Sequence, residues 1–189
     1  MERRGELTKI IQKDERLMEI LQIARSVNLP NWYVGAGVVR NAVWDNLHGN
    51  TKKTPIRDID LIYFSSEPID EEAVRQQLTS ALPEVEWDFK NSLNVHEWYK
   101  NKKGIERTAL MSSEQDIDNW PEVCSCIGVR LQDDDQLLIY APYGIDDLMD
   151  IVFRRNAAGE GITKEIFEWR VVHKEIQEKW PKVKVVWGS

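Results

Sequence analysis

Apolar residues recur at helical spacing over the first part of the chain, and a helix-ending segment follows them. The apolar positions on one face are Leu7, Ile10, Ile11, Leu17, Met18, Leu21, Ala24 and Val27. A period of 3.6 residues is typical of an amphipathic helix, and asparagine and proline are common where helices end. The pattern predicts one helix over residues 6–27, closed by Asn28-Leu29-Pro30.

The middle of the chain alternates between strand and helical patterns. The short β-prone run Trp32-Tyr33-Val34 comes first and breaks at Gly35. After it, the periodicity changes between 3.6 and 2 residues three times. The predicted elements are a helix over 38–47, a strand over 56–64, a helix over 70–82 with Asp70 as its N-cap, and a strand over 85–90. This order predicts an α+β fold.

Patterns are less regular after residue 112. A short helix is expected from Ser113 to about Pro121, followed by a hairpin. The remaining predicted elements are hairpin strands over 124–131 and 137–140 and helices over 145–155 and 163–179. Because no linker or repeat interrupts the chain, we expect a single domain over 1–189. Its core would span about 6–112, and a C-terminal elaboration about 113–189.

Composition limits the class of protein. Apolar residues make up 42% of the 189 residues, which is enough for a core. No apolar run reaches the roughly 18 residues of a membrane span, and the charged N-terminus is not a signal sequence, so a cytoplasmic location is expected. A net charge of −7 argues against binding of long nucleic acid. Cys124 and Cys126 are interpreted as buried free thiols, because a disulfide between such near neighbours is strained.

Candidate chemistry lies in a glycine turn and a pair of aspartates. Gly35-Ala36-Gly37 stands where a strand gives way to a helix, and about twenty residues later Asp58 and Asp60 alternate with apolar residues. Small residues let a ligand approach the backbone, and a helix N-terminus favours a phosphate. Residues two apart on a strand share a face. Paired carboxylates there suit Mg²⁺, which binds through one or two carboxylates plus substrate phosphates.

These motifs resemble those of the nucleotidyltransferase superfamily, which includes DNA polymerase β, CCA-adding enzymes and antibiotic nucleotidyltransferases. Residues 36–41 look like the G-G-x-V-R-D of the CCA-adding branch, with Ala36 replacing the first glycine and Asn41 replacing the aspartate. A closer resemblance is to a bacterial nucleotidyltransferase-like family of unassigned substrate. It covers Gly35 to Trp44, Asp58 to Phe64, Lys90-Asn91, Val95 to Tyr99, Ala141 to Leu148 and Trp180-Pro181.

The resemblance implies a mixed β-sheet flanked by helices, with a C-terminal hairpin and helices. It also implies site residues. Gly35, Ala36 and Gly37 would form the phosphate loop, Asp58 and Asp60 would hold the metals, and Asp88 on the following strand would be the third carboxylate. Glu86 is the alternative to Asp88. Arg40 either contacts a phosphate or pairs with Asp58 or Asp60.

The implied reaction is attack by an acceptor hydroxyl on the α-phosphate of a nucleoside triphosphate, with two Mg²⁺ ions. The acceptor would be a small molecule or a protein, because the chain is acidic. The alternative is a catalytically inactive nucleotide-binding or regulatory module of the same fold, including an antitoxin-type partner. The aromatic residues, including His96 and Trp98, are interpreted mainly as core contacts, although the latter pair could also contact a base.

Overall fold

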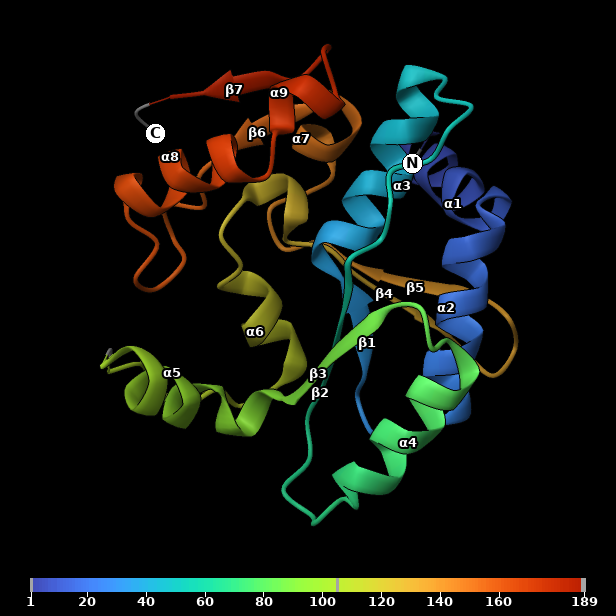
Figure 1. The fold of residues 1–189 in the computed structure, drawn as a ribbon, viewed down its shortest axis with the longest axis vertical. Coiled ribbons are helices and arrows are strands. Elements are labelled where there is room, and N and C mark those ends of the chain that lie inside the picture. Colours follow the sequence, from blue (N-terminus) through green and yellow to red (C-terminus); the bar gives the residue numbers. More distant parts are fainter. Residues whose placement is uncertain (1, 105, 188–189) are drawn as a thin grey trace.

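One five-stranded sheet organises the protein in the computed structural model, which describes residues 2–104 and 106–187 (Figure 1). The strand order is β3-β2-β1-β4-β5. The strands are β1 (Tyr33–Gly35), β2 (Asp58–Tyr63), β3 (Glu86–Asn91), β4 (Gly128–Leu131) and β5 (Leu137–Tyr140). β2 and β3 are parallel and the other pairs are antiparallel. The predicted α+β class with a mixed sheet is therefore confirmed.

Helices α3 (Ala36–His48) and α4 (Glu71–Ala81) agree with the predicted pattern. α3 ends at Gly49, whose φ of 70° lies in the left-handed region that favours glycine. The carboxylate of Asp70 accepts a hydrogen bond from Ala73 N at 3.0 Å and so caps α4, as expected. Because α4 connects β2 to β3, those two strands can lie parallel.

The prediction of one helix over 6–27 is wrong, because the segment forms α1 (Glu2–Lys13) and α2 (Glu15–Ser26). The two helices meet at Asp14, whose side chain accepts a hydrogen bond from Leu17 N at 3.0 Å. That bond satisfies a first-turn N–H of α2 and stabilises a new helix start. The apolar stripe is continuous across the break, so periodicity alone does not reveal it.

The C-terminal third contains shorter elements than predicted. Ile151 has a φ of 57°, which ends α7 (Asp146–Met149) before β6 (Val152–Arg154), so the expected helix over 145–155 is wrong in its second half. Glu175, with a φ of 53°, divides the expected 163–179 helix. The described elements from residue 92 on that complete the chain are η1 (Ser92–Asn94), α5 (Val95–Lys103), α6 (Ser113–Asp118), η2 (Val123–Ser125), α8 (Lys164–His173), α9 (Ile176–Lys179) and β7 (Lys184–Val186).

Aromatic packing attaches the C-terminal segment to α3. The rings of Trp44 and Trp180 meet edge to face with centroids 5.3 Å apart, and Phe153 also packs on Trp44. Trp180 Nε1 donates to Asp45 Oδ1 at 2.9 Å in the same buried region. α7 and the segment around Trp180 therefore lie against α3, the helix that follows β1 (Figure 1).

The structure also tests the predictions about the cysteines and the tryptophans. Cys124 and Cys126 are buried and free, as expected. The interpretation of the tryptophans as core is wrong for Trp98, Trp169 and Trp187, which are 42%, 56% and 52% exposed. Across the described residues, no helix has the length and apolar character that crossing a membrane requires.

Candidate functional site

The N-terminus of α3 presents free backbone donors. β1 ends at Gly35, and α3 begins at the next residue without a side-chain cap. The Ala36 N–H donates to the carbonyl of Ile127 at 3.3 Å. A side chain built at Gly37 would meet nothing within 4 Å, leaving aside the helix's own backbone, so the space beside this turn is open. Uncapped N–H groups at a helix N-terminus favour an anion.

Each of the three positions in the glycine turn places a different demand on the residue that occupies it. A Cβ on Gly35 would collide with the backbone oxygen of Ile127 and the ring of Trp120, so packing demands glycine there. Ala36 has a φ of 53°, a conformation that costs a non-glycine residue about 1–2 kcal/mol. This is the position at which the CCA-adding motif has its first glycine. Of the two glycines, Gly37 is the one that borders open space.

The strand carboxylates lie beside that turn. In the β1–β2 ladder Gly35 is the register partner of Asp60, and in the β2–β3 ladder Asp60 is opposite Asp88. Asp58 is opposite Glu86, one step further along the strands. Because alternate strand residues share a face, β2 and β3 together present four carboxylates on one surface.

The charges of two neighbouring carboxylates act on Asp60. Burial and the charges of Asp58 and Asp88 raise the pKa of Asp60 to about 6. Lys90 Nζ lies 2.5 Å from Asp88 Oδ2 and is the nearest counter-charge in this group. Asp60 therefore carries an incompletely neutralised negative charge at the edge of the glycine turn.

A cavity of about 410 Å³, here called the carboxylate hollow, opens in front of Asp60 and Asp88. Lys90, Asp116, Trp120 and Arg170 also line it, together with the half-exposed ring of Trp98. Trp98 is thus placed at a ligand-sized cavity and not in the core, which corrects the core interpretation of this residue.

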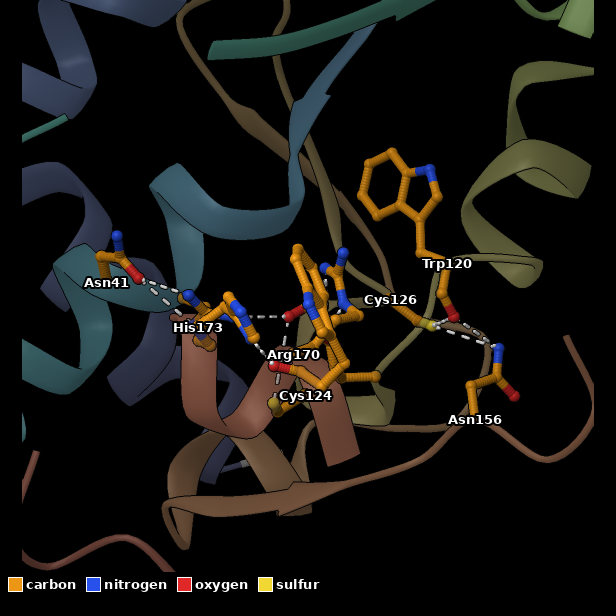
Figure 2. Close-up of polar contacts among 11 residues, drawn as sticks. Asn41, Trp120, Cys124, Cys126, Asn156, Arg170 and His173 are labelled. Atoms are coloured by element: carbon orange, nitrogen blue, oxygen red, sulfur yellow. Dashed lines mark hydrogen bonds and ion pairs between the residues drawn. The ribbon is translucent and has the colours of Figure 1, made fainter. Parts of the chain in front are cut away.

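Two of these residues are fixed in place by hydrogen bonds. Asn156 Nδ2 donates to the carbonyl of Trp120 at 2.9 Å and also contacts the sulfur of Cys126, as Figure 2 shows. Ser92 Oγ donates to Asp116 Oδ2 at 2.9 Å. Burial raises the pKa of Asp116 despite this bond. The wall opposite β2 is therefore built by residues 116–121, which the sequence pattern did not mark as a site.

A second cavity of about 180 Å³, here called the basic hollow, lies on the other side of the α3 N-terminus. Four cationic side chains and one carboxylate line it, namely Arg40, Arg57, Lys174, Lys179 and Asp58. Asn41 of α3 and His173 of α8 also belong to its wall, and Figure 2 shows both. Although the whole chain is acidic, this wall is predominantly positive.

Arg40 is buried, so its predicted ion pair with Asp58 or Asp60 is wrong. It is 3% exposed, donates to Ser125 Oγ at 3.1 Å, and lies 5.4–5.5 Å from the ring centroids of Trp180 and Trp44. Along residues 2–104 and 106–187, no ion pair joins it to either aspartate. The guanidinium supports the packing between α3 and the C-terminal segment.

A buried ion pair connects α8 to the same region. Arg170 donates to the carboxylate of Glu122, which is 1% exposed. Burial opposes ionisation of Glu122, but Arg170 and the more distant Arg40 hold its pKa below the usual range. Figure 2 shows Arg170 and His173 on the same helix. Neither Glu122 nor Arg170 has a periodic signature that could have identified it from the sequence.

Donor chemistry decides whether a metal fits. No three His, Cys, Asp or Glu side chains of the described chain are grouped closely enough to hold a metal ion by themselves. Asp58 and Asp60, however, share one strand face, and burial and repulsion already raise the pKa of Asp60. Mg²⁺ takes one or two protein carboxylates and completes its shell with phosphate oxygens and water. The pair therefore fits Mg²⁺ that arrives with a phosphorylated substrate.

The mixed sheet, with a helix opening beside two strand carboxylates, has the nucleotidyltransferase-type fold. A sequence profile described as nucleotidyltransferase matches residues 22–185. The chain therefore belongs to this nucleotidyltransferase family. A comparison with curated protein sequences gives no match.

Solved structures support the same assignment. An NMR structure described as revealing a CCA-adding enzyme head domain is 26% identical with a TM-score of 0.80, covering 97% of this chain and 95% of that one. The Thermotoga maritima CCA-adding enzyme complexed with tRNA and a CCA-adding enzyme with CTP share the fold at 14% and 13% identity, with TM-scores of 0.55 and 0.54. This chain covers only 42% and 43% of those two proteins.

Proposed function

We propose that this protein transfers a nucleoside monophosphate from a nucleoside triphosphate to a hydroxyl group of a small molecule or protein. The observation that carries the proposal is the register of the sheet. It sets Asp60 opposite Gly35, so that the carboxylate pair on β2 adjoins the uncapped N-terminus of α3. Phosphate-binding donors and metal-binding carboxylates thereby converge, as phosphoryl transfer requires.

In this proposal both aspartates of β2 serve as metal ligands. Asp58 and Asp60 would hold Mg²⁺, which would supply positive charge to the phosphates and to the attacking oxygen. The Gly37 turn would let the triphosphate approach the helix N–H groups. Asp88 would be the third carboxylate, since it is opposite Asp60 and lines the carboxylate hollow, whereas Glu86 is exposed and outside it.

The proposed step is a single displacement at phosphorus. The acceptor oxygen forms a bond to the α-phosphorus, and the bond from that phosphorus to the oxygen bridging to the β-phosphate breaks, releasing pyrophosphate. Asp88 accepts the hydroxyl proton as general base. Lys90, 2.5 Å from Asp88, holds the carboxylate at the wall of the hollow. Atoms and charges balance without any further reactant.

The acceptor is expected to be small or a protein side chain. This chain covers only 42% of the Thermotoga maritima CCA-adding enzyme that was solved with tRNA, and its net charge is −7. Binding a nucleic-acid backbone depends on clustered Lys and Arg. In the carboxylate hollow the acidic side chains outnumber the basic ones, with Asp60, Glu71, Asp88 and Asp116 against Lys90 and Arg170. These features favour a compact acceptor in that hollow.

A second candidate is an inactive nucleotide-binding module of the same fold. Its specific support is that Asp88 is engaged by Lys90 and that no three-ligand metal group is formed by the described residues. Such a module would bind a triphosphate without releasing pyrophosphate. The two candidates therefore differ in turnover and not in binding.

Pyrophosphate release is the measurement that tests the proposal. Purified protein with Mg²⁺ would receive each of the four ribonucleoside triphosphates, with a panel of hydroxylated metabolites, proteins and tRNA as acceptors. We expect release with a small or protein acceptor, abolished in Asp58→Asn/Asp60→Asn and retained in Glu84→Gln, an exposed carboxylate control. Metal-dependent binding without release would support the inactive module. Release that requires tRNA would overturn the expected acceptor class.

A further inference from the structure

The two hollows adjoin at the start of α3. Three segments, namely the start of α3, β2 and the end of α8, each contribute a residue to one hollow and a nearby residue to the other. The carboxylate hollow is lined by Ala36, Asp60 and Arg170, and the basic hollow by Gly37, Asp58 and Lys174. A ligand placed at the α3 N-terminus therefore reaches both cavities. The two cavities differ in charge, which allows each to receive a different part of that ligand.

Among the cations that line the basic hollow, Lys174 is the half-buried side chain that has no partner among the described residues to account for its position. It follows α8 directly and is half-buried, yet its ammonium group makes no hydrogen bond or ion pair with any described residue. Lys179, by contrast, donates to the backbone oxygen of Lys174 at 2.8 Å and pairs with Glu175 at 3.0 Å. Long charged side chains are rarely buried without a partner.

Neighbouring charges make the position of Lys174 more costly still. Burial and the cations Arg170 and Arg40 lower its pKa, and Glu122 and Asp58 offset this only in part. Glu122 is itself already paired with Arg170. Three cations therefore act on the one buried carboxylate of Glu122, and two of them, Arg40 and Lys174, line the basic hollow beside Gly37. An anionic ligand would relieve this excess.

We infer that Lys174 binds the β- and γ-phosphates of the nucleoside triphosphate, so that the basic hollow receives the polyphosphate and the carboxylate hollow the nucleoside and acceptor. This assignment rests on the proposed function. It gives the segment after α8 a direct part in substrate binding. Ala36 lines one cavity and Gly37 the other, so the uncapped start of α3 lies between them, where the α-phosphate would sit.

Calorimetric titration with the α,β-methylene analogues of ATP, CTP, GTP and UTP, and with the matching monophosphates, tests the assignment in the presence of Mg²⁺. Lys174→Gln is expected to weaken binding of the triphosphate analogue by about tenfold or more, the effect of one charge-assisted contact. Binding of the monophosphate should change by less than about twofold. Lys174→Arg keeps the charge and should retain most of the affinity, and Lys9→Gln on α1 is the exposed control.

Failure of the assignment differs from failure of the proposed function. If wild-type protein binds a triphosphate analogue and Lys174→Gln binds it equally well, or loses triphosphate and monophosphate affinity alike, the assignment is overturned and the proposed function stands. If wild-type protein binds none of the analogues with Mg²⁺, both are overturned. Circular dichroism of each variant establishes that it is folded before titration.

Discussion

Replacing Asp60 by asparagine is expected to stabilise the folded protein at neutral pH while it abolishes nucleotidyl transfer. Burial and the charges of Asp58 and Asp88 raise the pKa of Asp60 to about 6, from an ordinary value of 3.8. The folded state therefore binds a proton at this carboxylate more tightly than the unfolded chain does. Asparagine cannot ionise, so the variant escapes the cost of a charged group at this position.

The magnitude follows from the difference between the two pKa values. Each unit between them corresponds to about 1.4 kcal/mol, which sets an upper limit of roughly 3 kcal/mol at pH 8. Because Asp60 is half-buried and the asparagine amide needs hydrogen bonds of its own, we expect about 1–2 kcal/mol. The sign follows from proton linkage. The loss of wild-type stability caused by ionised Asp60 is absent below about pH 4. It grows as the pH rises to about 6, and it is complete above that pH.

Urea unfolding followed by tryptophan fluorescence measures this difference. Wild type, Asp60→Asn and the exposed turn control Asp133→Asn would be compared at pH 4.5, 5.5 and 7.5 with EDTA. The advantage of Asp60→Asn should grow across that range, whereas the control should stay level with wild type. An advantage that does not change with pH, or a variant less stable than wild type at pH 7.5, would refute the reasoning. Adding Mg²⁺ should then stabilise wild type more than the variant.

Three further predictions concern the turn and the thiols. Ala36→Gly relieves the positive φ and should stabilise the protein by about 0.5–1 kcal/mol in urea unfolding, whereas Ala42→Gly inside the same helix should cost about 1 kcal/mol or more. Gly35→Ala should fail to give soluble folded protein because its Cβ has no space, whereas Gly37→Ala should fold with unchanged stability or better and show weaker triphosphate binding in calorimetry. Burial raises the pKa of the Cys124 thiol to about 12, so it should react with a disulfide reagent only after unfolding, as absorbance would record.

Local patterns were sufficient for the strands that carry the aspartates, whereas the strand predicted over 124–131 begins only at Gly128. The alternation around Asp58 and Asp60 predicted β2, and the Asp70 cap predicted the start of α4, because both signals lie within a few residues of the structure they determine. Patterns failed where a single backbone angle interrupts a continuous apolar stripe. Ile151 and Glu175 adopt positive φ values that no composition signal marks, and both end helices early.

The candidate site likewise contains residues that the sequence predicts and residues that it does not. The glycine turn and the β2 aspartates could be found from sequence because their chemistry depends on spacings of two residues. Arg170 and Lys174 could not, because tertiary packing alone brings them to the two hollows beside that turn, and Glu122 is reached only through its pair with Arg170. In the helical pattern Arg170 simply occupies a polar position. Its partner Glu122 belongs to a segment with no clear period.

Arg40 explains how these two halves of the site are held together. In the sequence it resembles the arginine of a nucleotide-binding motif, yet its guanidinium lies against the rings of Trp44 and Trp180 and donates to Ser125. The contact joins the helix that carries the glycine turn to the C-terminal segment that carries Lys174 and Trp180. A cation buried in this way adds to the positive potential of the basic hollow, which it also lines. The distance between the turn and Lys174 is therefore set by core packing, so that loosening of this packing should reduce triphosphate affinity before it affects the carboxylates on the sheet.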